Sequence, residues 1–240
     1  MCTVSFIARQ KGYLLGMNRD EKLTRAPGLP PKLLRVQGRR VIQPSERGGG
    51  TWIALNESGA TLALINWYSI SARVKTNPVS RGEVVKAASF ARAPEEVESE
   101  LAKLLLRRIN PFRLIGIFLA TSEVAEWRWD LKKLVRRDHA WETQQWISSG
   151  FDEPEAQRVR SRTFSRARKQ ITFASVDWLR RLHRSHGRER GPFSTCMHRV
   201  DAATVSYTEV SVSGTVRRMS YHAGPPCELR ASKTVLLKPE

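Results

Sequence analysis

The second residue of the chain, Cys2, follows directly on Met1. An initiator methionine is normally removed when the residue after it is small, so Cys2 is expected to become the N-terminus of the mature protein. It then carries a thiol and a free α-amine on one residue, and an α-amine with a pKa of about 8 can take up the thiol proton. The start of the chain therefore predicts a cysteine nucleophile that needs no separate histidine base.

Several strings follow this Met-Cys start. The polar tetrapeptide NRDE (Asn18–Glu21) ends the second predicted strand, and PGLPP, GGGTWIALNESG and INWY come before residue 70. Together they resemble the NRDE family, also called the transport and Golgi organisation family. Weaker matches return in QQWISSGF, around CMHR and in GPPC. The resemblance implies an N-terminal-nucleophile hydrolase fold, that is, an α+β four-layer αββα sandwich with mostly antiparallel sheets.

The same residues also resemble an enzyme group, the choloylglycine hydrolases and penicillin V acylases. These enzymes begin with Met-Cys, carry Arg-Asn-x-Asp at the end of a hairpin, and then have Asn-Glu-x-Gly and Leu-Asn-Phe. The resemblance implies that Cys2 is the nucleophile, that Asp20 holds the α-amine, and that Asn66 supplies the oxyanion-hole amide. A thiolate, a base, a carboxylate that orients the base and an amide donor form a coherent set for amide hydrolysis.

Three positions depart from the enzyme pattern. Met17 stands where the enzyme group has arginine, and Arg19, two residues along the same strand face, is the candidate replacement, although it could also face solvent or a ligand. Ser149 stands where a second asparagine is expected, with a hydroxyl in place of the amide. The late arginine of the enzyme group is assigned to Arg199, a choice whose register the sequence does not fix.

The residues around these positions are the candidates for lining a ligand pocket. They are Asn18, Glu21, Trp52, Asn56 and Trp67. The triplet Gly48-Gly49-Gly50 could cradle an anion through its backbone N–H groups or could form a turn.

The metal-binding side chains show no familiar spacing. The three cysteines, Cys2, Cys196 and Cys227, form no C-x-x-C pair, and the histidines form no H-x-x-x-H pair. We therefore predict no metal and no cofactor, and we expect Cys196 and Cys227 to be buried or inert thiols.

The elements that must position these residues follow from hydrophobic patterning. Residues 2–8 and 13–19 are predicted to form a strand hairpin, and residues 20–50, rich in Pro and Gly, a loop region. Further strands are expected in TWIAL, TLALINWYS and FRLIGIFLA, a strand or a hairpin in EWRWDLKKLVRRD, and four more strands from TCMHR to SKTVLLKP. Helices are predicted from Pro94 to Asn110, from a cap at Asp152 to about Arg168, and from a cap at Ser175 to His183. Strands, then helices, then strands indicate an α+β domain.

The composition sets outer limits. The chain of 240 residues has 40% hydrophobic residues, which excludes global disorder, and its formal net charge is +18. We expect one domain over residues 1–240, no membrane span, no signal peptide and a cytoplasmic location. Eleven Lys or Arg against two acids lie between Arg158 and Arg190, a run that fits either an anion-binding surface or a solvated helix face.

Three functions fit the sequence. The first is a cysteine amidohydrolase acting on a non-peptide C–N or acyl bond. The second, implied by the family resemblance, is a binding or trafficking protein for haem, acyl-coenzyme A or a related anionic, lipid-like ligand. The third, nucleic-acid binding through the basic run, has no recognised motif and is the least favoured.

Overall fold

Two antiparallel sheets make up the centre of the protein in a computed structural model that describes residues 2–228 and 231–238. Within that range the first sheet has six strands in the order β10-β1-β2-β11-β12-β13. Their bounds are β1 (Cys2–Arg9), β2 (Gly12–Lys22), β10 (Gln144–Ser148), β11 (Ala202–Ser213), β12 (Arg217–Ala223) and β13 (Ser232–Leu237). The β1–β2 hairpin, predicted from the sequence, thus lies inside a sheet completed by strands from the far end of the chain.

The second sheet follows the chain order. Among the described residues its seven strands run β3-β4-β5-β6-β7-β8-β9. Their bounds are β3 (Leu29–Val36), β4 (Arg39–Ser45), β5 (Ile53–Asn56), β6 (Ala60–Asn66), β7 (Phe112–Phe118), β8 (Glu123–Trp129) and β9 (Leu134–His139). Every neighbouring pair is antiparallel and joined by a short connection or a helical crossover.

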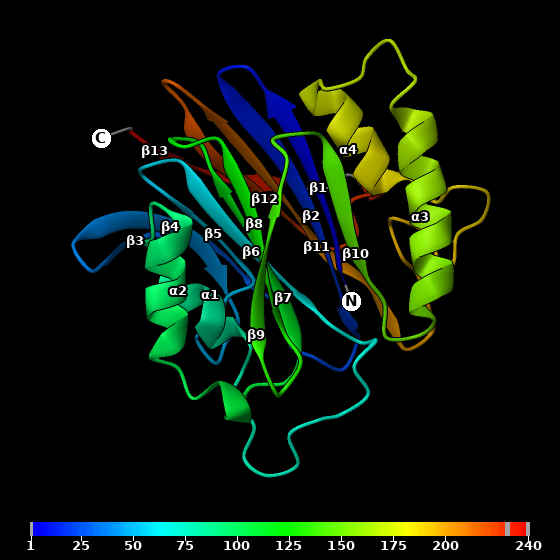
Figure 1. Ribbon diagram of the computed structural model, residues 1–240. Coiled ribbons are helices and arrows are strands. Elements are labelled where there is room, and N and C mark those ends of the chain that lie inside the picture. The colour runs from blue at the N-terminus through cyan, green and yellow to red at the C-terminus, as the bar shows by residue number, and fades with distance from the viewer. Residues whose placement is uncertain (1, 229–230, 239–240) are drawn as a thin grey trace.

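Helices cover the outer faces of the two sheets, which gives the four layers αββα (Figure 1). The helices α1 (Gly82–Ala88) and α2 (Pro94–Ala102) lie on the second sheet, followed by a 3₁₀ turn at Leu106–Arg108. The helices α3 (Glu153–Ala167) and α4 (Val176–Arg184) lie on the first sheet. The predicted α+β sandwich is confirmed. None of the described helices is long and apolar enough to cross a membrane.

Apolar side chains separate each pair of layers. One cluster lies between the sheets and includes Phe6, Leu15, Trp52 and Ile115. Each such side chain, fully buried, contributes about 1.5–3 kcal/mol relative to an exposed one. Two further clusters lie under α1 and α2 and under α3 and α4.

The predicted caps of the two later helices are confirmed. The Asp152 side chain accepts a hydrogen bond from the Glu155 backbone N–H at 3.0 Å, and the Ser175 hydroxyl accepts one from Trp178 at 3.0 Å. Each cap contributes about 1 kcal/mol to helix stability. These caps hold α3 and α4 in register on the sheet that carries Cys2.

Other predictions for the elements were wrong. Residues 20–50 contain the hairpin β3–β4; Pro30 and Pro31 are tolerated because β3 is an edge strand with an irregularity between Leu29 and Lys32. The helix that begins at Pro94 ends at Ala102, well before Asn110, and α1 was not predicted. The CMHR segment forms only one isolated bridge, between His198 and Ala203.

Candidate active site

Cys2 opens on a cavity of about 320 Å³ where the two sheets meet, at the end of β1 marked N in Figure 1. The first sheet contributes Cys2, Arg19 and Asp20 to its wall, the second contributes Asn66, and Trp52 lies directly before β5. The segment 78–82, which leads into α1, lines the remaining side. The strands β1 and β2 of one sheet and β6 of the other therefore bring the polar groups of Cys2, Arg19, Asp20 and Asn66 together.

Strand register explains how Cys2 and Arg19 come to share the cavity. Cys2 pairs directly with Arg19 across the β1–β2 ladder, so the two side chains point to the same face of the sheet. That face is turned toward the second sheet, and the two residues are only 7% and 5% exposed. Arg19 thus stands beside the nucleophile candidate, as expected if it replaces the arginine missing at Met17.

Asp20 lies one residue further along β2 and is held from the α3 side. Its Oδ1 accepts a hydrogen bond from Thr204 Oγ1 at 2.6 Å, and its Oδ2 accepts one from Arg160 Nη1 at 3.2 Å. The same Arg160 nitrogen donates to Thr3 Oγ1 at 2.7 Å. Because the Asp20 and Arg160 side chains are both fully buried, losing either leaves an uncompensated buried charge.

Arg160 was missed by the sequence analysis, which counted it within the basic run. A signal was present, since Ala156, Arg160 and Phe164 recur every four residues and form the buried face of α3. A charged residue on the apolar side of a helix requires a buried partner, and here the partner is Asp20.

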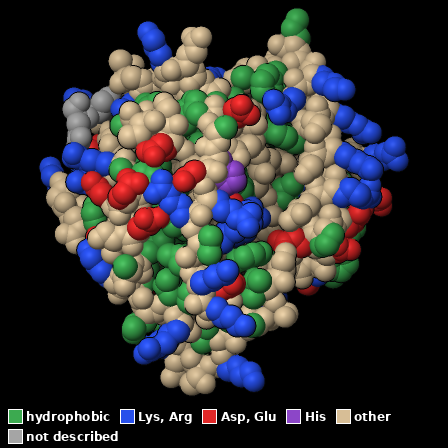
Figure 2. Space-filling model, in the orientation of Figure 1, with side chains coloured by type: hydrophobic (Ala, Val, Ile, Leu, Met, Phe, Trp, Pro, Cys, Tyr) green, Lys and Arg blue, Asp and Glu red, His purple; other side chains and the backbone are tan. Residues whose placement is uncertain are grey.

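The rest of the basic run is a mixture of paired and solvent-facing side chains. Figure 2 shows Lys and Arg side chains along the right-hand side, where Figure 1 places α3. Within the run, Arg158 pairs with Glu155, and Arg180 donates to both carboxylate oxygens of Glu209. A part of this charge is therefore neutralised by carboxylates of the same chain.

Asn66 ends β6 and reaches the cavity wall. Its Nδ2 donates a hydrogen bond to the Tyr68 hydroxyl at 2.7 Å. An asparagine amide carries two N–H donors, so one remains for a ligand oxygen. Tyr68 belongs to the INWY string, but the sequence analysis gave it no role.

Ion pairs surround the mouth of the cavity. Arg19 donates to Glu46 at 2.6 Å, and Arg25 bridges Glu46 and Glu21 at 2.9 Å each. The Arg19 guanidinium also lies over the Trp52 ring, 4.6 Å from its centroid. Glu21 and Trp52, both predicted pocket residues, are therefore part of the cavity wall.

The glycine triplet forms a turn that places Glu46. The Glu46 backbone N–H donates to the Gly50 carbonyl at 2.8 Å, and Gly49 has a φ of +83°, which favours glycine. Nearby, a Cβ on Gly82 would lie 2.7 Å from the Thr51 nitrogen, so only glycine allows α1 to begin this close to the cavity. The turn, one of the two interpretations of the triplet, is what this structure contains.

Arg81 lines the cavity without a carboxylate partner among the described residues. Its Nη1 donates to the Pro111 carbonyl at 3.4 Å, and burial lowers its pKa, which the nearby Tyr68 raises to a smaller extent. A half-buried guanidinium without a carboxylate partner can donate charge-assisted hydrogen bonds to an anionic ligand.

Five predicted site residues do not line this cavity. Asn18 donates to the His183 and Thr195 carbonyls, and Asn56 donates to the Ser89 and Ala91 carbonyls within a turn. The remaining three lie further along the chain and are Trp67, Ser149 and Arg199.

Each of these three has other neighbours. Trp67 lines a separate hollow with Arg128 5.9 Å from its ring centroid. Ser149 is buried just beyond β10, where its backbone N–H donates to Glu153 at 3.4 Å. Arg199 pairs with Asp201.

The electrostatic surroundings of Cys2 favour the neutral thiol in the resting state. Burial raises the pKa of the Cys2 thiol, the Asp20 carboxylate raises it further, and Arg19 lowers it. The thiolate therefore needs a nearby base at the moment of attack. The α-amine created by removal of Met1 could serve, but Met1 lies outside the described residues.

Comparisons with known proteins bear on the family and the fold. The sequence profile of the family described as Transport and Golgi organisation 2 matches residues 1–144. No curated protein matches the chain.

Among solved structures, a cysteine-to-alanine mutant of the conjugated bile acid hydrolase from Clostridium perfringens is similar, with a TM-score of 0.61 and 10% identity over 99% of this chain and 92% of that chain. An arginine-to-leucine variant of the same hydrolase gives a TM-score of 0.53 and 9% identity over 100% of this chain and 97% of that chain. At such low identity these matches establish the fold, which is that of the N-terminal-nucleophile hydrolases.

Proposed function

The chain belongs to the Transport and Golgi organisation 2 family, and on that premise we propose that it is a cysteine N-terminal-nucleophile hydrolase of a non-peptide C–N or acyl bond. One observation carries the proposal: Cys2, Asp20 and Asn66 line the same cavity. The hydrolase-like fold, found in both bile acid hydrolase structures, supports it further. We also propose that residues 1–240 act as one domain and that the protein works in the cytoplasm.

The proposed reaction begins at the mature N-terminus. The α-amine of Cys2 takes the thiol proton, and the sulfur attacks the substrate carbonyl. The free N–H of Asn66 donates to the developing oxyanion, and Asp20 orients the amine. The ammonium then returns its proton to the leaving amine, alcohol or, for a thioester substrate, thiol, which leaves a thioester on Cys2. Water, deprotonated by the same amine, cleaves that thioester.

The cavity also suggests the class of substrate. Arg81 offers a half-buried positive charge without a carboxylate partner in the described part of the chain, and Trp52 offers an aromatic surface. An acyl compound with an anionic group fits both features. Acyl-coenzyme A thioesters and N-acyl amino acids both belong to this class.

Acyl-enzyme trapping tests the proposed chemistry. The full chain, expressed with a C-terminal tag so that Met1 can be removed, is mixed with p-nitrophenyl acetate, and its intact mass is followed in time. We expect one acetyl group on the peptide that starts at Cys2, removable by hydroxylamine, and none when an N-terminal tag is retained. A tagged chain that acylates and turns over as fast as the processed chain would contradict the mechanism.

A second function, favoured by the guanidinium groups of Arg19, Arg25 and Arg81 around the cavity, is binding without turnover. Haem, acyl-coenzyme A and related anionic lipid-like molecules would be the ligands of such a trafficking protein. Native mass spectrometry of protein from its host separates the two functions. If an anion remains bound after purification and no acyl-enzyme forms, the result would favour binding over hydrolysis.

A further inference from the structure

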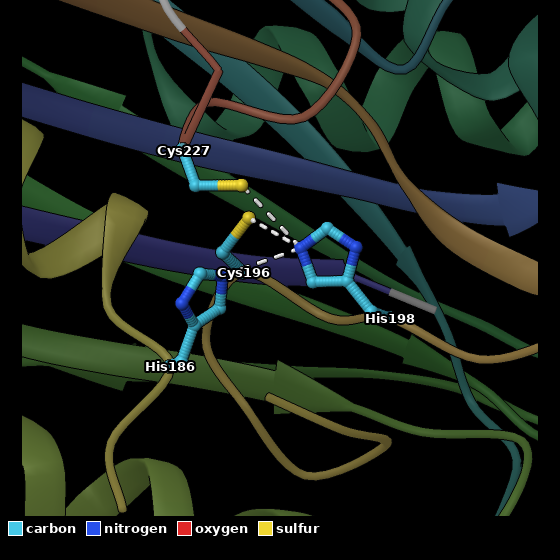
Figure 3. Close-up of side chains that lie close together, drawn as sticks. All are labelled: His186, Cys196, His198 and Cys227. Atoms are coloured by element: carbon cyan, nitrogen blue, oxygen red, sulfur yellow. Dashed lines mark hydrogen bonds between the residues drawn. The ribbon is translucent and has the colours of Figure 1, made fainter. Parts of the chain in front are cut away.

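Four side chains that commonly bind metals lie together, as Figure 3 shows, and none of them lines the Cys2 cavity. His186 follows α4, Cys196 and His198 lie in the segment before β11, and Cys227 follows β12. One potential ligand atom from each lies within 4.8 Å of those of the other three. The sequence separations give no recognisable metal motif, which is why the spacing analysis predicted no zinc site.

The contacts converge on one atom. His198 Nε2 lies 3.3 Å from His186 Nε2, 3.5 Å from Cys196 Sγ and 3.4 Å from Cys227 Sγ. An imidazole nitrogen has either one hydrogen or one lone pair, so it cannot make three good hydrogen bonds at once. Hydrogen bonding therefore does not explain why four such groups surround one point.

We propose that His186, Cys196, His198 and Cys227 form a structural zinc site. Zinc binds sulfur at about 2.3 Å and nitrogen at about 2.0–2.1 Å in a tetrahedron. The edges of that tetrahedron are about 3.3 Å between two nitrogens and about 3.5 Å between nitrogen and sulfur, as follows from those bond lengths. The three measured distances agree with these edges.

The ligand set specifies the metal class. Two thiolates and two imidazoles suit zinc, whereas magnesium and calcium take oxygen ligands. Two thiolates also neutralise the doubly charged ion, so the site adds no charge to a chain of net charge +18. Because all four positions are taken by the protein, no position is open for substrate, and the site is structural rather than catalytic.

A metal cross-link suits the segment that carries these ligands. Residues 185–201 have no helix or strand, and backbone contacts such as Cys196 N to Ser185 O at 3.0 Å fold the segment back on itself. Gly187, with a φ of +69°, turns the chain directly after His186. Cys196 is fully buried and the other three ligands are half-buried, so the ion would be shielded from solvent.

One contact must change when zinc binds. Arg190 Nη2 lies 3.2 Å from His198 Nδ1. When Nε2 binds the metal, Nδ1 carries the hydrogen and cannot accept a bond. The Arg190 side chain is exposed, so it is free to turn into solvent.

The zinc site would also support Asp20, a consequence that rests on the proposed function. Met197, between two of the ligands, donates its backbone N–H to Thr204 Oγ1 at 2.8 Å, and Thr204 donates to Asp20 Oδ1 at 2.6 Å. Fixing Cys196 and His198 therefore fixes the residues that hold the Asp20 carboxylate.

Metal analysis of the full chain tests the site without using activity. The protein is purified with a tag that contains no histidine, and its zinc is measured by inductively coupled plasma mass spectrometry and native mass spectrometry. We expect one zinc ion per chain in the wild type and in Cys2→Ala, the matched cysteine control. We expect less than about one tenth of an equivalent in Cys227→Ser and in His186→Ala.

A second measurement covers variants that fail to fold. The wild-type chain is stripped by a chelator and loaded with cobalt, and the thiolate-to-cobalt absorption bands are recorded; strong bands support the site. A wild-type chain that takes up neither zinc nor cobalt would overturn the proposal. A disulfide between Cys196 and Cys227, found in the intact mass under non-reducing conditions, would overturn it as well. A failure of acylation at Cys2 would leave the metal content unchanged, so the two proposals fail separately.

Discussion

We call His186, Cys196, His198 and Cys227 the zinc cluster. The zinc cluster and the Cys2 cavity lie on two sides of Asp20 and are built in opposite ways. The cavity uses neighbouring positions on paired strands, such as Cys2 beside Arg19. The zinc cluster uses connecting segments that follow α4, precede β11 and follow β12. Strand pairing leaves a compact motif in the sequence, whereas a site assembled from distant loops leaves none.

Asp20 connects the two regions. It lines the cavity, and it is held by Thr204, which in turn contacts the backbone between Cys196 and His198. On the α3 side it is held by the buried Arg160. The comparison therefore predicts that changes in the two regions affect turnover to different degrees and by different routes.

The largest effect should separate the two cysteines. Cys2→Ala removes the nucleophile, so turnover should fall at least about a thousandfold while zinc stays bound. Cys227→Ser should release zinc and lower turnover only about tenfold to a hundredfold, because it acts on Asp20 through intermediates. Steady-state kinetics and metal content measured on the same samples check both. Equal loss of turnover in the two variants would contradict the expected difference between the nucleophile and the zinc ligand.

The next effect concerns the buried support of Asp20. Arg160→Met leaves a buried carboxylate without its ion pair, so the free energy of unfolding should fall by about 3–5 kcal/mol. Arg158→Met, two residues earlier on the exposed side of α3, removes only a solvent-exposed pair with Glu155 and should leave the urea midpoint unchanged. Urea unfolding at neutral pH measures both. Similar midpoints for the two variants would show that the Asp20–Arg160 pair is not a stabilising contact.

A smaller effect is expected in the pH dependence of the free energy of unfolding. It comes from His183, which points from α4 toward the first sheet, with its Nε2 3.0 Å from Ser5 Oγ. Burial lowers the pKa of His183 from 6.5 to about 3. Below the unfolded pKa, the unfolded chain binds a proton that the folded chain excludes. Stability should therefore be complete above that pH and fall by up to about 1.4 kcal/mol per unit as pH drops toward the folded value.

The control for this pH dependence is His183→Gln. Loss of zinc in acid should weaken both proteins equally, so the difference between their stabilities isolates His183. We expect the variant to show a shallower decline than the wild type between pH values of about 6.5 and 5, measured by urea unfolding. Parallel declines would show that His183 does not exclude the proton.

The smallest effect concerns Arg81 and tests whether the cavity alone binds the ligand. Arg81→Met should raise KM about fivefold for an anionic substrate with little change in kcat, since it removes binding shared by ground and transition states. A neutral substrate of similar size should show no change, and zinc content should stay the same. A fall in kcat with unchanged KM would instead place Arg81 beside the reacting atoms.

The β1–β2 hairpin and the starts of α3 and α4 could be predicted from the sequence because their signals are local. The hairpin of β1 and β2 alternates apolar residues around a glycine turn, and the caps at Asp152 and Ser175 lie directly before α3 and α4. The hairpin β3–β4 was missed because Pro30 and Pro31 are usually read as loop residues, and only the edge position of β3 permits them.

The cavity could be predicted in part. Cys2, Arg19, Asp20 and Asn66 follow from motifs carried by neighbouring strands, and the structure brings them together. Arg160, the buried partner of Asp20, could be recognised only because it is a charged residue on the otherwise apolar face of α3.

Positions that depend on long connections could not be placed from the sequence. Arg199 was assigned without a fixed register, and the structure places it beside Asp201, away from Cys2. The zinc cluster shows the same limit, since its four ligands come from segments whose meeting depends on the whole first sheet.

The position of β1 has a consequence for synthesis on the ribosome. The strand that carries Cys2 is made first, yet it lies between β2 and β10, and β2 in turn needs β11. These late partners leave the ribosome only after most of the chain has been made, so the nascent nucleophile strand keeps open hydrogen-bonding edges until then. Arg160 and Thr204, which hold the Asp20 carboxylate, are also made late, so this buried carboxylate gains its partners only when most of the chain has been synthesised.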